Sequence, residues 1–272
     1  MGESSVLWLR VAAVLYSVGL VEAVITAVRR REVFFRAALG AFGLGALFHL
    51  VSTVEQGLEQ HTLPVNDIFQ TMSFCSLMIA ISFLAIYSRY KAGSLSVFIF
   101  PLVFIMTLVG ALRSPVSPWS NPVIGNTLLI SHVAASLVGY AALLFTAAAA
   151  VAYLIQEKQL KRKQTNSLYR VLPPLGTLDD LISKSLGIGF AFITLGIVIA
   201  SIWGFLEMGT RWIGKPSIAI SFVTWAVYLA LVFFRVSAGW RGRKTAILSI
   251  VALACCVVTW LAHAQLQKHL LQ

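Results

Sequence analysis

The sequence predicts an all-α, polytopic integral membrane protein with eight transmembrane helices. Three observations lead to this fold class. Of the 272 residues, 58% are hydrophobic and 11% are charged, and the mean hydropathy of +0.85 lies far above that of soluble domains. The apolar residues form runs of about 20, the length that a helix needs to cross a hydrocarbon core. Basic residues gather in alternate loops between those runs, as is typical of cytoplasmic loops.

Each apolar run is expected to be a helix, because hydrocarbon offers the backbone no hydrogen-bond partner and the alternation of an outer-membrane barrel is absent. No basic region precedes the first run and no small-residue cleavage site follows a short apolar core, so we interpret this run as a helix and not as a signal peptide. No sizeable soluble domain fits between the runs, which predicts one transmembrane domain over residues 1–272. The eight helices are predicted near residues 5–28, 33–54, 67–88, 94–112, 125–155, 186–206, 217–235 and 244–265.

The longest predicted loop runs from Gln156 to Lys184 and contains six basic residues. Pro173 and Pro174 would stop a helix that continues from the fifth run. Thr177 or Asp179 could then cap the next helix. We interpret this loop as a cytoplasmic contact surface or, alternatively, as a solvated connector near anionic lipid.

The distribution of Lys and Arg predicts the orientation in the membrane. Sixteen basic residues fall in one set of loops and four in the opposite set, while Arg10 lies within the first run. Because basic loops stay on the cytoplasmic side, both termini are expected outside. The sixteen are Arg29, Arg30, Arg31, Arg36, Arg89, Lys91, Lys158, Lys161, Arg162, Lys163, Arg170, Lys184, Arg235, Arg241, Arg243 and Lys244, and the four are Arg113, Arg211, Lys215 and Lys268.

Common catalytic and redox motifs are absent from the sequence. There is no Walker loop, no G-x-G-x-x-G, no C-x-x-C and no zinc-spaced cluster. Cys75, Cys255 and Cys256 all fall within apolar runs and are expected to be small core residues. No aromatic residues alternate with the basic run "KQLKRKQ", so the net charge of +11 indicates topology and not nucleic-acid binding.

All five histidines are expected at or near the outer face. His49 and His132 lie about two helical turns from the ends of their runs, and His263 lies in the last turns of the eighth. His61 and His269 are expected in an outer loop and a tail. A histidine near a helix end is often a hydrogen-bonded core residue, but a layer of imidazoles also suits a flat, hydrophobic ligand such as haem.

Zinc or copper is the competing metal ion that such a layer of imidazoles could bind. Those ions usually recruit carboxylates or thiolates as well, and Asp67 and Glu207 are the nearest carboxylates in the same outer layer. A small-solute transporter is a third class, but the sequence shows no inverted repeat or interrupted helix pair.

Several stretches resemble a known family. These are "ISHVAASLVGYAALLFTAAAAVAYLIQEKQLKRK", "LPPLGTLDDLISKSLGIGFAFITLGIVIASIWG", "TWAVYLALVFFRVSAGWRGRKTAILSI" and "HTLPVNDIFQTMSF". They are similar to the haem-handling membrane proteins of cytochrome c assembly, the CcsA, CcmC and CcmF group with its HemX-like relatives. The resemblance covers about residues 45–260.

This resemblance implies a haem site. In the family a tryptophan-rich outer loop lies over haem and flanking histidines supply axial ligands. The stretch Ile202–Trp225 would be that loop. By resemblance, the cofactor-binding residues are His132, His263, His49, Trp203, Trp212 and Trp225, with His269 as the alternative to His263, and the iron ligands are His132 and His263.

The chain departs from the family pattern at two places. The expected W-x-W-D-P-K-E becomes "WIGKPSI", so that Gly214 and Lys215 replace the second tryptophan and the aspartate, and Ser217 and Ile218 replace the lysine and glutamate. A second transmembrane histidine is expected where Phe233 stands.

The resemblance implies a haem-binding, haem-handling component of cytochrome c maturation in the bacterial inner membrane, with haem b as its cofactor. Its partners would be haem, the lipid bilayer and cytochrome c assembly proteins or haem-biosynthesis enzymes, and no nucleic acid. The protein would not catalyse bond formation itself. The alternative is a HemX-like membrane regulator of tetrapyrrole biosynthesis that acts through protein contacts.

Overall fold

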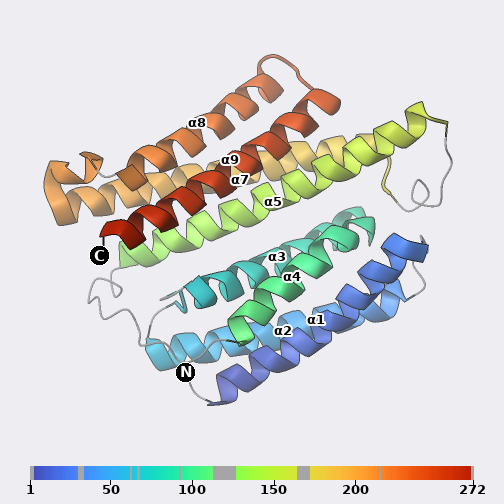
Figure 1. The fold of residues 1–272 in the computed structure, drawn as a ribbon, viewed down its shortest axis with the longest axis horizontal. Coiled ribbons are helices and arrows are strands. Elements are labelled where there is room, and N and C mark those ends of the chain that lie inside the picture. Colours follow the sequence, from blue (N-terminus) through green and yellow to red (C-terminus); the bar gives the residue numbers. More distant parts are fainter. Residues whose placement is uncertain are drawn as a thin grey trace. The chain divides into compact units, whose positions relative to one another are not determined.

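The computed structural model describes residues 3–29, 34–61, 63–65, 68–91, 93–112, 127–163, 172–214 and 216–270, which are helical apart from short turns. The all-α fold class is confirmed for these residues. Eight α-helices lie in them, and each covers one of the predicted runs (Figure 1): α1 (Glu3–Arg29), α2 (Phe35–Gln60), α3 (Ile68–Tyr90), α4 (Ser96–Ala111), α5 (Thr127–Lys161), α7 (Leu175–Met208), α8 (Pro216–Val236) and α9 (Arg243–Leu270). Two short 3₁₀ helices, η1 (Gly93–Leu95) and η3 (Gly209–Gly214), precede α4 and α8.

Six of the described helices are long and apolar enough to cross a membrane. The chain is therefore a polytopic membrane protein. α4 is apolar but only 16 residues long, and α9 is not among the six, so eight crossings remain a prediction. The six spans are Ser4–Thr26, Phe35–Gln60, Phe69–Tyr90, Thr127–Lys161, Leu175–Leu206 and Ile218–Val236.

Several helices extend beyond their apolar runs. α2 continues to Gln60, because polar residues can prolong a helix once its backbone hydrogen bonds are established. α5 ends at Lys161, well before Pro173, and α7 begins at Leu175. The predicted helix cap is wrong. Thr177 and Asp179 lie inside α7, Pro174 occupies the N-cap position without a side-chain cap, and the Asp179 carboxylate instead pairs with Arg235 at 2.7 Å.

The chain divides into two compact units, which are described separately. Unit 1 comprises Met1–Asn126 and Gln159–Pro173, and therefore contains α1 to α4. Unit 2 comprises Thr127–Lys158 and Pro174–Gln272, with most of α5 and all of α7, α8 and α9. The single transmembrane domain over 1–272 stays a prediction.

The core of unit 1 is an aromatic cluster on all four helices. The ring of Phe42 stacks on that of Phe100, with centroids 4.3 Å apart, and Phe83 meets both rings edge-on. Tyr16 packs on Phe42 at 4.9 Å. A Cβ at Gly19 would lie 2.9 Å from the Phe100 ring, so glycine is needed for α1 to approach α4. This close packing fixes the helices around His49.

The core of unit 2 joins α5, α7, α8 and α9. Cys256 lies in it, as expected of a small core residue, whereas Cys75 and Cys255 are half-buried. Partly buried Phe190 and Trp225 pack against this core from α7 and α8. Its buried members are Leu143, Leu186, Ile193, Tyr228, Leu231, Ala252 and Cys256.

Candidate functional site

His132 is the best-positioned candidate ligand among the described residues. It lies on α5, five residues or about 7.5 Å from the helix start. Its side chain is half-buried, and its Nδ1 lies 2.7 Å from the carbonyl oxygen of Gly196 on α7. A carbonyl oxygen can only accept, so Nδ1 carries the proton and donates. The other ring nitrogen, Nε2, is then left with a free lone pair that can bind a metal.

Glycines bring α5 and α7 close enough for this hydrogen bond. A Cβ at Gly196 would lie 2.7 Å from the Ser136 hydroxyl oxygen and 3.7 Å from the carbonyl oxygen of His132. Farther along the same interface, a Cβ at Gly139 would lie 2.8 Å from Ile193. Such contacts are typical of membrane helices that pack through small residues. The backbone of α7 therefore holds the imidazole ring of His132 in place.

Trp203 lies on the same face of α7 as Gly196. The two residues are seven positions apart, which is about two helical turns or 10 Å along the axis. The ring of Trp203 is half-buried, and its Nε1 is buried with no hydrogen-bond partner in the described part of the chain. A buried indole N–H normally has an acceptor. Trp203 therefore has an uncommitted donor on the helix face that meets the start of α5.

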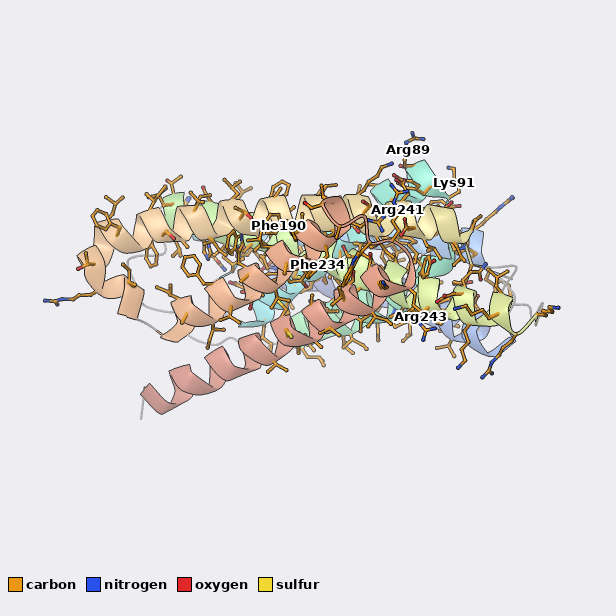
Figure 2. All side chains as sticks on the ribbon, turned by 90° about the horizontal axis from the view of Figure 1, so that it is seen from above. Arg89, Lys91, Phe190, Phe234, Arg241 and Arg243 are labelled. Atoms are coloured by element: carbon orange, nitrogen blue, oxygen red, sulfur yellow. The ribbon has the colours of Figure 1, made fainter. Side chains whose placement is uncertain are left out.

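Trp225 does not have a free donor. Its Nε1 donates to the hydroxyl of Thr194 on α7 at 3.0 Å, and its ring stacks on Phe190 with centroids 6.1 Å apart. Phe190 is labelled in Figure 2 on the α7 side of this contact. Trp225 lies within α8, beyond the 3₁₀ helix that joins α7 to α8. It therefore packs the core of unit 2 and does not lie on the connecting loop.

His49 lies in unit 1 and is fully buried, at 0% exposure. Its Nε2 is 2.9 Å from the Ser73 hydroxyl on α3, and its ring meets Tyr16 edge-on. Its Nδ1 has no hydrogen-bond partner among the described residues. Because α2 continues to Gln60, His49 lies about 16 Å from the helix end and not two turns from it. As placed here, its ring is a poor fit for haem iron, since Nε2 is occupied and Nδ1 is sealed from solvent.

The other predicted residues are placed only by their backbone or lie at the surface. His61 is exposed and ends α2 in the left-handed conformation, at φ 54°. Trp212 lies in η3, and His263 lies in α9. His269 also lies in α9, so the expectation of a tail there is wrong. The side chains of Trp212, His263 and His269, and all of Lys215 and Asp67, lie outside the described residues.

Two features of unit 2 were missed from the sequence. Gly196 reads as one of many glycines in an apolar run, although its carbonyl orients His132. The pair of Asp179 and Arg235 had a weak signal, because each lies near the end of an apolar helix, although Asp180 directly beside Asp179 pairs with Lys184 instead. In the described part of the chain, no three His, Cys, Asp or Glu side chains lie together as a metal cluster.

Known proteins resemble most of this chain. The family described as cytochrome C assembly protein matches residues 43–271. A protein named cytochrome c biogenesis protein CcsA from Prochlorococcus marinus is 24% identical over 258 residues, which are 86% of this chain and 83% of the relative. Proteins of the same name from Guillardia theta and Chlorella vulgaris are 25% and 24% identical, covering 76% and 85% of this chain and 74% and 82% of the relatives. No solved structure matches.

Proposed function

This chain belongs to the cytochrome c assembly protein family, and from that premise we propose that it binds and handles haem during cytochrome c maturation. The observation that carries the proposal is the hydrogen bond from His132 Nδ1 to the carbonyl oxygen of Gly196. This bond selects the tautomer whose Nε2 can ligate iron, and it holds the ring against rotation.

In the proposed site, a planar, hydrophobic ligand would bind to unit 2 at the start of α5. His132 would supply one axial ligand to haem b, and the N–H of Trp203 would donate to an acceptor on the bound molecule. Haem itself supplies the iron centre that the apocytochrome needs. The protein contributes binding and orientation, and no bond-forming step is assigned to its side chains.

The remaining site residues enter as parts of the same proposal. His263 is the candidate for the second axial ligand, with His269 as its alternative, because both lie near the end of α9. Trp212 would cover the ligand from η3. Trp225 would support the site indirectly by packing on Phe190. His49, buried in unit 1, is a candidate cofactor-binding residue by the family resemblance alone, and its Nε2 could bind iron only after giving up its bond with Ser73.

The predicted setting is a bacterial inner membrane with both termini outside. Sixteen basic residues in one set of loops support this orientation. Cytochrome c assembly proteins or haem-biosynthesis enzymes would be the protein partners, and the segment from Gln156 to Lys184 is a candidate contact surface for them.

A HemX-like regulator of tetrapyrrole biosynthesis is the second candidate. The departure of "WIGKPSI" from the family's tryptophan-rich motif favours it, because Gly214 and Lys215 remove an aromatic ring and reverse a charge. In this case the protein would act through contacts of its cytoplasmic loops, and haem would bind weakly or not at all.

An absorption spectrum of the protein purified in mild detergent tests the proposal. We expect a Soret band in the unmodified protein, its loss or shift in His132→Ala, and its partial recovery when imidazole is added to that variant. His61→Ala is the matched control, because His61 is exposed at the end of α2 and should leave the spectrum unchanged. A wild-type spectrum in His132→Ala would refute the ligand assignment. Absence of haem from the unmodified protein would favour the regulator.

A further inference from the structure

The turn between α8 and α9, residues 237–242, is built on one buried ion pair. The side chain of Arg235 is 9% exposed, and its guanidinium binds both carboxylate oxygens of Asp179, at 2.8 and 2.7 Å. The same guanidinium donates to the carbonyl oxygens of Asp179 and Trp240, both at 3.2 Å, and to the Ser183 hydroxyl at 3.4 Å. All the donors of Arg235 are therefore used inside the protein.

The same carboxylate also fixes the backbone of the turn. The N–H of Gly242 donates to Asp179 at 2.9 Å, and the Thr245 hydroxyl donates to the carbonyl oxygen of Trp240 at 2.9 Å. Gly239 and Gly242 have φ values of 65° and 66°, which other residues adopt only with strain. The turn thus has one well-defined conformation before anything binds to it.

Three cations remain on this turn and the first residues of α9 after Asp179 has neutralised Arg235. Arg241, Arg243 and Lys244 are exposed, and none of them forms an ion pair in the part of the chain that the structure describes, although Arg241 also acts electrostatically on Asp179. We call these three residues the turn cations. Figure 2 labels Arg241 and Arg243, together with Phe234, near the turn from α8 to α9. By contrast, the nearby Asp180 and Lys184 of α7 neutralise each other at 2.8 Å.

An aromatic pair lies beside the turn cations. The ring of Trp240 stacks on Phe234, with centroids 4.6 Å apart, and Lys244 lies over the Trp240 ring at 5.3 Å. Aromatic rings with a nearby cation are typical of the level at which a membrane meets water. The turn is therefore built like a membrane boundary.

Exposed apolar side chains continue directly from the turn cations along α9. Lys244, Ile247, Val251 and Val258 follow one another at spacings of three, four and seven residues, which places them on one face of the helix, and all are exposed. At the end of α8, Val236 is exposed as well. This surface has cations at one end and an apolar stripe beyond them. It is therefore complementary to an anionic lipid, which has a negative headgroup at one end and an apolar acyl chain beyond it.

We propose that the turn cations bind the phosphate headgroup of an anionic phospholipid, whose acyl chain lies along the exposed face of α9. The geometry favours a lipid over an acidic protein surface, because an acidic protein would match the cations and leave the apolar stripe unused. The fixed backbone of the turn favours binding, since only the side chains of the three cations, and not the chain that carries them, have to be ordered when the lipid arrives. This inference concerns a site separate from His132 and does not depend on haem binding.

Native mass spectrometry of the detergent-purified protein tests this site. The probes are phosphatidylglycerol and phosphatidylcholine with the same acyl chains. We expect tight binding of one phosphatidylglycerol and weak binding of phosphatidylcholine. Replacing all three turn cations, as Arg241→Gln, Arg243→Gln and Lys244→Gln, should weaken phosphatidylglycerol binding about a hundredfold, from a contribution of about fivefold per cation.

A control variant with the same loss of charge distinguishes a specific lipid site from non-specific attraction of anionic lipid by the protein's positive charge. The control removes three exposed cations from unit 1, by the substitutions Arg36→Gln, Arg89→Gln and Lys91→Gln. This variant should retain the bound lipid. Equal loss in both variants, equal binding of the two lipids, or displacement by inorganic phosphate at the lipid's own concentration would each overturn the proposal. Unchanged lipid binding with loss of a co-purifying acidic protein would overturn it in favour of a protein partner.

The variant that lacks the three turn cations keeps the ion pair of Asp179 and Arg235, so a loss of lipid binding cannot be attributed to misfolding of the turn. The three substitutions do not alter Asp179, Arg235 or Thr245, so the turn should still fold. The thermal midpoint of the variant in phosphatidylcholine should match that of the unmodified protein. In phosphatidylglycerol the unmodified protein should gain stability and the variant should not, and equal gains in both would refute a lipid site at this turn.

Discussion

Removing the Asp179 carboxylate should destabilise unit 2 much more than removing the exposed carboxylate of Asp180 beside it. Asp179→Ala leaves the guanidinium of Arg235 without its bidentate partner in a place where its side chain is 9% exposed. The change also removes the acceptor of the Gly242 N–H. Breaking one side of a buried pair costs about 3–5 kcal/mol. Because Asp179 is itself 21% exposed, we expect a loss of about 3 kcal/mol, at the lower end of that range.

The next residue in the sequence provides the matched control. Asp180 forms an exposed pair with Lys184, with side chains 45% and 58% exposed, so Asp180→Ala should cost less than about 0.5 kcal/mol. Asp179→Asn, which keeps one acceptor oxygen, should lie between the two alanine variants. These three variants rank the buried pair against an exposed pair on the same helix.

Reversible unfolding in mixed SDS and maltoside micelles, followed by tryptophan fluorescence, measures these differences. We expect the unfolding transition of Asp179→Ala at a distinctly lower SDS fraction, and that of Asp180→Ala close to the unmodified protein. If the two alanine variants were equally stable, the ion pair would not hold the α8–α9 turn. Replacement of both Asp179 and Arg235 by alanine should recover part of the loss, because no buried charge then lacks its partner.

Three further changes test other parts of the fold. Gly189→Ala places a Cβ 2.7 Å from Leu143 and should lower the stability of the protein by about 1–3 kcal/mol in the same assay. As the control, a Cβ in Gly187→Ala meets no atom within 4 Å, so this variant should be as stable as the unmodified protein. Equal effects of the two substitutions would contradict the close packing of α5 and α7. Trp225→Phe loses the bond to Thr194 and should cost about 1 kcal/mol without abolishing haem binding, and loss of the spectrum would place Trp225 in the ligand site. A periplasmic reporter fused to the C-terminus should be active, and a cytoplasmic reporter inactive, if the termini lie outside.

The helices were predictable because their cause is local. A membrane imposes helix on any run of about 20 apolar residues, so all eight runs appear as helices in the described residues. The helix ends were less predictable. Hydropathy falls at residue 54 of α2, but the helix continues to Gln60, since backbone hydrogen bonding does not require apolar side chains. This extension places His49 deeper in its helix than its position in the apolar run suggested.

The family resemblance predicted His132 as an iron ligand, and the structure adds that its Nδ1 donates to the carbonyl oxygen of Gly196. Sequence spacing cannot show that a glycine carbonyl 64 residues away accepts the Nδ1 proton, because that contact depends on how α5 and α7 pack. The same limit applies to Trp225, whose sequence position suggested the connecting loop but whose N–H is taken by Thr194. The N–H of Trp203 has no acceptor among the described residues, although both residues are tryptophans from one aromatic stretch.

Composition and charge order determined by themselves that this chain is a helical membrane protein, because those properties sum over many residues and tolerate local errors. Composition and charge order could not predict the partner or the structural role of a single charged residue. Asp179 lies where a helix cap is expected, yet it accepts three hydrogen bonds from Arg235 and Gly242, more than 50 residues away. Only the packing of α7 against α8 and the following turn decided this pairing, since a charge at the end of an apolar helix takes the nearest partner in space and not in sequence.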